Sequence, residues 1–131
     1  MRISRALLDE IVEHAEAEAP NECCGIIAAR DGDAVRVHRA VNIHASPLRY
    51  EIDPSELLRI YNDIDGAGCE LGAIYHSHTR SPPEPSQTDV NLAAGWPDPL
   101  YVIVGLAGAE PEVCAYEIRD GQVTEAELHI G

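Results

Sequence analysis

The segment Ile74-Tyr-His-Ser-His-Thr-Arg-Ser-Pro-Pro-Glu-Pro-Ser-Gln-Thr-Asp89 carries the densest pattern of chemically active side chains in this sequence of 131 residues. It begins within a largely apolar run, Cys69 to Ser77, which predicts a buried strand that reaches the surface at its end. Thr79 to Pro85 contains three prolines and predicts an irregular loop. The residues from Ser86 to about Gly95 predict a short helix. A strand, a loop and a helix are therefore expected here in succession.

Two histidines stand at the end of the predicted strand. His76 and His78 are two residues apart, so both side chains are expected on one face of the sheet, where they can share a metal ion. Asp89, after the loop, is a candidate third ligand. Two histidines and a carboxylate leave a fourth zinc position open, as catalytic sites require. Ser86 to Asp89 also has the spacing of a capping box, and both interpretations can hold, because an aspartate in the first helical turn can still face a metal.

The flanking sequence predicts helices alternating with strands. Spaced apolar residues predict a helix from the N-cap Ser4 to Ala19, before Pro20, and Asp53-Pro54-Ser55-Glu56 predicts the start of a second helix that ends near Asp65. Asn42 to Arg49 is expected to form a loop. Strands are predicted at Glu22–Arg30 and Ala34–Val41 around the turn Asp31-Gly32, at Tyr50–Ile52, at Leu100–Leu106, and at Glu112–Arg119 and Gln122–Ile130 around Asp120-Gly121. We expect one domain, residues 1–131, of the α/β class, with a mixed β-sheet flanked by helices.

Composition excludes several classes of function. The net charge is -14, all nine basic residues are arginine, and there is no lysine for a Schiff base or a phosphate loop. An acidic surface repels phosphate backbones, so nucleic-acid binding is not expected. The longest uncharged apolar stretch, Leu100 to Ala109, is far shorter than a membrane span, and the N-terminus does not resemble a secretory signal. We therefore predict a cytoplasmic protein without a membrane partner.

The cysteines and the other histidines show no ligand spacing. No CxxC pair is present, so we expect buried free thiols at Cys23, Cys24, Cys69 and Cys114. We expect surface positions for His14, His38, His44 and His129. Other chemistries lack essential parts: there is no HExxH helix, the deaminase-like His14-Ala-Glu16 has no cysteine half, and Cys23 and Cys24 lack the exposed setting of a nucleophile.

The spacing His76-x-His78, seven residues, Ser86, two residues, Asp89 resembles the JAMM motif of the MPN-plus metalloproteases. The resemblance implies that His76, His78 and Asp89 bind one zinc ion per chain and that Ser86 stabilises the tetrahedral intermediate. It also implies an upstream glutamate that activates water. Glu22 fits this role, because Pro20-Asn-Glu-Cys-Cys-Gly-Ile-Ile27 resembles the entry to the first strand of the family.

The resemblance extends over most of the chain and implies the MPN fold, which is similar to that of cytidine deaminases. Ser46-Pro47, Arg49-Tyr50 and Asp53-Pro54 resemble the bacterial branch, whereas Thr79 stands where many bacterial members have proline.

The resemblance implies zinc-dependent hydrolysis of an amide bond. Small bacterial members resemble the hydrolase that releases cysteine from the C-terminal glycine of a ubiquitin-like sulfur-carrier protein, a step in cysteine biosynthesis. We expect this activity, with a carrier that ends in Gly-Gly as the partner. The alternatives are trimming of a C-terminal extension from such a carrier and, in a different class, a non-catalytic MPN scaffold. The oligomeric state stays open, with a homodimer as one option.

Overall fold

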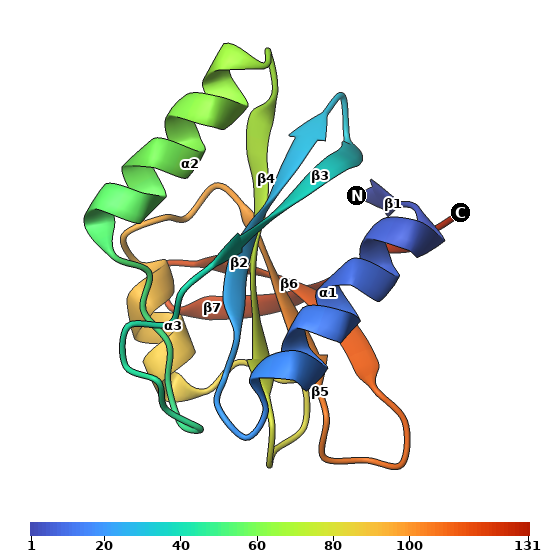
Figure 1. The fold of residues 1–131 in the computed structure, drawn as a ribbon, viewed down its shortest axis with the longest axis vertical. Coiled ribbons are helices and arrows are strands. Elements are labelled where there is room, and N and C mark those ends of the chain that lie inside the picture. Colours follow the sequence, from blue (N-terminus) through green and yellow to red (C-terminus); the bar gives the residue numbers. More distant parts are fainter.

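A mixed sheet of eight strands runs through the computed structural model, which describes all 131 residues (Figure 1). The helices are α1 (Arg5–Glu18), α2 (Pro54–Gly66) and α3 (Gln87–Ala93). The strands are β1 (Arg2–Ile3), β2 (Cys24–Arg30), β3 (Asp33–Ala40), β4 (Glu70–His78), β5 (Leu100–Gly105), β6 (Glu112–Arg119), β7 (Gln122–Ala126) and β8 (His129–Ile130). Their order across the sheet is β7-β6-β5-β4-β2-β3-β1-β8.

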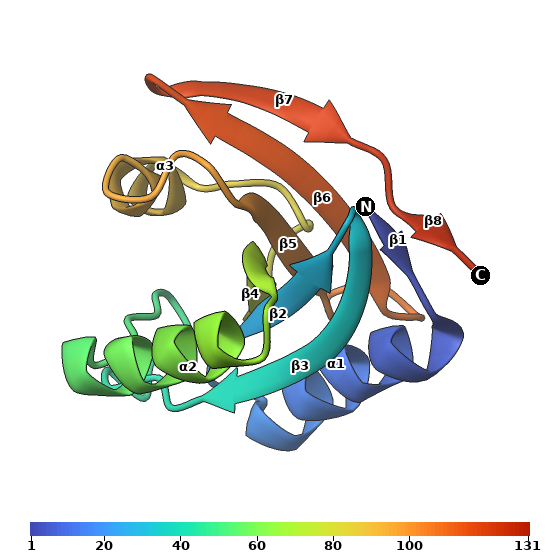
Figure 2. The ribbon, with the colours of Figure 1, turned by 90° about the horizontal axis from the view of Figure 1, so that it is seen from above.

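Parallel and antiparallel pairs are combined in this sheet. β4 and β5 are parallel, as are β1 with β3 and β1 with β8, and the remaining pairs are antiparallel. Seen from above, the sheet curls, with α1 on one side and with α2 and α3 on the other (Figure 2). The predicted class, a mixed sheet flanked by helices, is confirmed.

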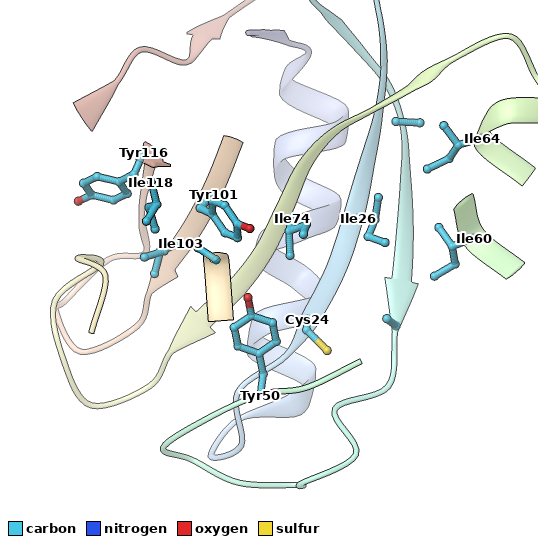
Figure 3. Packing of buried hydrophobic residues seen from close by; sticks show 13 residues of the cluster. Cys24, Ile26, Tyr50, Ile60, Ile64, Ile74, Tyr101, Ile103, Tyr116 and Ile118 are labelled. Atoms are coloured by element: carbon cyan, nitrogen blue, oxygen red, sulfur yellow. The ribbon is translucent and has the colours of Figure 1, made fainter. Parts of the chain in front are cut away.

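Helices cover both faces of the central strands, so these strands are buried on both sides. Along β4, Ile74 belongs to the core beneath α2 and α3, whereas Ala73 and Tyr75 belong to the core beneath α1. Figure 3 shows Ile74 among the residues of the first core. Because side chains alternate along a strand, His76 and His78 share the face of Ile74 and lie on the side of α2 and α3.

The predicted helix starts are confirmed by their caps. Ser4 Oγ accepts a hydrogen bond from Leu7 N (3.2 Å), and Asp53 Oδ1 accepts one from Ser55 N (2.8 Å). Glu56 does not bond back to the cap; its Oε1 accepts from Val41 N (2.8 Å) and ties the start of α2 to the end of β3.

The sequence predictions differ from the structure in three strands. The two-residue strand β1 was not predicted, and Gln122–Ile130 is not one strand, because the chain leaves β6 after Ala126 and β8 pairs with β1 at the other end of the sheet. Tyr50–Ile52 forms no strand beyond a single bridge between Ile52 and Asn42. The side chain of Asn42 accepts a hydrogen bond from Glu51 N and donates one to Arg49 O. These backbone groups therefore bond to a side chain and not to a neighbouring strand.

The prediction of a surface position for His14 is wrong. His14 is buried, and its Nδ1 lies 2.7 Å from the hydroxyl of Tyr75. Burial lowers the pKa of His14. The ring of Tyr75 crosses Gly25, where an added Cβ would lie 2.3 Å from the ring, so this position requires glycine. His129 is exposed as expected, whereas His38 and His44 are half-buried.

All four cysteines are free. Cys23 and Cys24 are fully buried, and burial raises the pKa of their thiols to about 11 and about 12, which keeps them protonated. Cys69 and Cys114 are only half-buried, contrary to expectation. None of the helices combines the length and apolar character needed to cross a lipid bilayer.

Candidate metal centre

His76 and His78 lie at the end of β4 and point into one buried space. Both residues are almost inaccessible, with relative exposures of 0% for His76 and 4% for His78. The two Nε2 atoms are 3.2 Å apart. The predicted pairing of these residues on one face is therefore confirmed.

Asp89 joins the histidines from the first turn of α3. Its Oδ2 lies 3.0 Å from His76 Nε2 and 2.9 Å from His78 Nε2. The same oxygen accepts from Ser86 N (2.9 Å), while Ser86 Oγ accepts from Asp89 N (3.1 Å), which completes a capping box. Burial opposes ionisation of Asp89, but the hydrogen bonds with the two histidines outweigh it and hold its pKa far below the ordinary range. The capping box and the approach to the histidines thus occur together.

Glu22 reaches the same space from the entry to β2. β2 and β4 are antiparallel with Cys24 opposite His76, which brings Glu22, two residues earlier, toward the level of His78. Glu22, His76 and His78 each offer a ligand atom, and these atoms all lie within 4.8 Å of one another. Burial, with a smaller contribution from Asp89, raises the pKa of Glu22 to about 7, although His78 opposes the shift.

Neighbouring groups orient the two imidazole rings. His78 Nδ1 lies 2.9 Å from Pro82 O, so a proton on Nδ1 donates to this carbonyl and leaves Nε2 free to bind a metal. Tyr50 stacks on His76, with ring centroids 4.4 Å apart and planes at 22°. Tyr50 and Pro82 had no predicted role; the sequence signal was the pair Arg49-Tyr50 and the proline-rich loop, but neither indicates a contact with a histidine.

The buried polar atoms fit a divalent metal ion. His76 Nε2, His78 Nε2 and Asp89 Oδ2 form a triangle with sides of 2.9, 3.0 and 3.2 Å. Bonds of about 2.0–2.1 Å to a tetrahedral zinc place neighbouring ligands about 3.3 Å apart, which is close to these values. Glu22 Oε1 and His76 Nδ1 are buried without a hydrogen-bond partner. An unpaired buried carboxylate oxygen is costly and points to a cation as its neighbour.

Ser86 stands at the exposed rim of this space. Its Oγ accepts the capping hydrogen bond from Asp89 N, and the hydroxyl hydrogen donates to no protein atom. The hydroxyl is therefore free to donate to a group that enters from solvent.

The family model for prokaryotic homologs of the JAB domain matches residues 4–119. The chain belongs to the JAB family. This JAB-family chain is a metallopeptidase of the JAMM type, with a buried Glu/His/His group at its metal site. The scaffold alternative is thereby excluded.

Two relatives of the JAB-family chain are peptidases. It is 36% identical to a CysO-cysteine peptidase of Mycobacterium tuberculosis over 127 residues, which cover 95% of this chain and 86% of the relative. It is 40% identical to a probable TtuB-protein conjugate cleaving protease of Thermus thermophilus over 121 residues, which cover 92% of this chain and 77% of the relative.

A solved structure establishes the fold of the JAB-family chain. A JAB1/MPN domain protein of Archaeoglobus fulgidus superposes with a TM-score of 0.68 at 20% identity, over 99% of this chain and 98% of that protein. This similarity confirms the predicted MPN fold.

Proposed function

We propose that this protein is a zinc-dependent peptidase that hydrolyses the amide bond after the C-terminal glycine of a ubiquitin-like sulfur-carrier protein and releases cysteine. The observation that carries the proposal is the convergence of His76 Nε2, His78 Nε2 and Asp89 Oδ2 beside a buried glutamate. The similarity to a CysO-cysteine peptidase over 95% of the chain supports cysteine as the leaving group.

We assign zinc to His76, His78 and Asp89, and the role of base to Glu22. Asp89 Oδ2 lies within 3.0 Å of both Nε2 atoms and is held there by Ser86 N, as a fixed ligand requires. A bound zinc ion supplies Lewis-acid chemistry, in that it polarises a carbonyl oxygen and makes a water molecule more acidic. The donor set also accepts other divalent ions, but two histidines with a carboxylate and an open position are typical of zinc.

Glu22 and Ser86 perform the remaining steps. Glu22 accepts a proton from the attacking water and later gives it to the leaving amine, a role that its buried position beside His76 and His78 allows. The hydroxyl of Ser86, which donates to no protein atom, donates to the oxygen that becomes negatively charged. In this scheme no other residue has to take up a proton.

An apolar surface beside the site fits the body of the carrier protein. Leu58, Tyr61, Leu92 and Trp96 expose 59%, 43%, 41% and 36% of their surfaces on and near α2 and α3. A pocket of about 170 Å³ is lined by Leu92, Trp96 and Tyr50 among others, and Tyr50 also stacks on His76, so this pocket adjoins the site. The exposed apolar side chains favour an apolar face on the carrier. The net charge of -14 favours a basic or neutral rim around that face.

The similarity to a conjugate-cleaving protease of Thermus thermophilus favours a second function. In this function the protein would cut a carrier from another protein or from a C-terminal extension. The two functions differ in the leaving group. The test offers the zinc-loaded protein two substrates, a sulfur carrier with cysteine after its Gly-Gly end and the same carrier joined to a longer peptide, and detects products by mass spectrometry.

We expect cysteine release to be the faster reaction. The Glu22→Gln variant, which lacks the base, serves as the control. Faster cleavage of the longer conjugate would establish the second function instead. If neither carrier is cut, both proposals are wrong.

A further inference from the structure

Asn42, which follows β3, is bonded through its whole carboxamide. Its Nδ2 donates to Glu22 O (3.0 Å) and Arg49 O (3.0 Å), and its Oδ1 accepts from His44 N (3.1 Å) and Glu51 N (3.2 Å). An amide side chain has two donor hydrogens and one oxygen with two acceptor positions, so every position is used. All four partners are backbone groups. Asn42 therefore joins its own loop, residues 42–52, to the main chain of Glu22.

The main chain of Glu22 is held from both directions by this 42–52 loop. Its carbonyl accepts from Asn42 Nδ2, and its N–H donates to Ser46 O (2.8 Å). The carboxylate has no equivalent support, since Oε1 is buried without a hydrogen-bond partner. The position of the carboxylate consequently depends on the main chain, and the 42–52 loop fixes that main chain.

The 42–52 loop also contacts a histidine of the metal centre. Tyr50, within the loop, is buried and stacks on His76 at a centroid distance of 4.4 Å. Arg49 O and Glu51 N, the neighbours of Tyr50, are both bonded to the Asn42 side chain. One side chain thus joins the main chain of the base, Glu22, to the segment that carries the ring stacked on His76.

We propose that Asn42 is a positioning residue, which holds the carboxylate of Glu22 beside His76 and His78, where it can accept a proton from the attacking water. The proposal rests on the role of Glu22 as base in the proposed function. Aspartate cannot replace Asn42, because it lacks the two donor hydrogens that reach Glu22 O and Arg49 O. Misplacement of a reacting group by about 1 Å can lower a rate about 100-fold, so a modest loosening has a measurable effect.

The test begins with Asn42→Asp, which has nearly the same shape and keeps the acceptor oxygen for His44 N and Glu51 N. We expect kcat to fall about 10-fold, with KM and zinc content unchanged. The control is His44→Ala, which removes the 3.0 Å contact of His44 Nε2 with Glu51 Oε1 in the same loop but no contact with Glu22. This variant should keep the kcat of the wild type. Asn42→Ala takes the place of Asn42→Asp if circular dichroism shows that the latter is unfolded.

A double-mutant cycle with Glu22→Gln distinguishes positioning of the base from a general structural role. If Asn42 acts through Glu22, adding Asn42→Asp to Glu22→Gln changes the residual single-turnover rate by less than about 2-fold. A further loss of about 10-fold in that background would overturn the proposal while leaving Glu22 as the base. An effect on KM alone, or an unchanged kcat, would overturn it as well. If Glu22→Gln itself keeps the rate of the wild type, the assignment of the base is wrong, and the role of Asn42 falls with it.

Discussion

The pKa values of Glu22 and Asp89, the two carboxylates of the metal centre, are shifted in opposite directions. Replacing each carboxylate by its amide is therefore predicted to have opposite effects on the thermal stability of the metal-free protein. Burial raises the pKa of Glu22 from 4.5 to about 7. The folded state therefore holds a proton on Glu22 that the unfolded state has released, and stability declines as pH rises from about 4.5 to about 7. Above this range the cost is about 3 kcal/mol, at roughly 1.4 kcal/mol per pH unit.

Glu22→Gln removes the charge and with it this cost. We expect the melting temperature of the metal-free variant at pH 8 to exceed that of the wild type by roughly 10 °C, since 1 kcal/mol corresponds to about 3 °C in a domain of this size. The difference should shrink as pH falls from about 7 toward 4.5 and close below pH 4.5, where Glu22 is protonated in both states. Asp89→Asn should lower the melting temperature, because the carboxylate of Asp89 is stabilised in the folded protein by His76 and His78.

The measurement is thermal unfolding followed by circular dichroism after chelation and dialysis, between pH 4.5 and pH 8. Glu84→Gln, at an exposed acid in the loop between β4 and α3, is the matched control and should leave the melting temperature unchanged. The reasoning fails if Glu22→Gln is no more stable than the wild type at pH 8, or if its advantage is the same at every pH.

Three further predictions concern other groups. His76→Ala removes a ligand and should abolish stoichiometric zinc in the purified protein, measured by elemental analysis, while His44→Ala retains it; retention of zinc by His76→Ala would contradict the ligand assignment. Ser86→Ala should lower kcat about 100-fold with zinc content unchanged and lower stability by about 1 kcal/mol through loss of the cap of α3; a normal kcat would exclude Ser86 as the oxyanion donor. Burial lowers the pKa of His14, so the folded protein binds a proton there less readily than the unfolded chain does. The wild type should therefore lose stability relative to His14→Gln as pH falls below about 6.5, and a melting-temperature difference that is equal at pH 7.5 and pH 5.5 would refute this.

Local sequence signals were sufficient for the helices and for the metal-facing segment. Ser4, Asp53 and Ser86 each mark a helix start by side-chain chemistry that acts within three residues, so no knowledge of the tertiary structure was needed. The alternation along β4 likewise determined that His76 and His78 share a face. These signals predicted the strand, loop and helix that bring Asp89 to the histidines.

The contacts that the sequence did not reveal connect distant parts of the chain. His14 is buried because Tyr75, 61 residues later, offers it a hydroxyl, and nothing in helical spacing indicates this partner. β1 and β8 are two residues long, too short to show a period, and they exist because the two ends of the chain meet. Asn42 appears in the sequence as an ordinary loop residue, since its four bonds depend on how residues 42–52 fold against Glu22.

Asp89 Oδ2 serves the start of α3 and the two histidines with a single atom. Formation of the first turn of α3 and assembly of the metal centre are therefore coupled. A conformer in which α3 is unwound no longer holds Asp89 Oδ2 beside the two histidines. A local opening of seven residues, far smaller than global unfolding, is enough to dismantle the centre while β4 keeps its place in the sheet. Amide exchange of α3 consequently reports the fraction of molecules in which the centre is assembled.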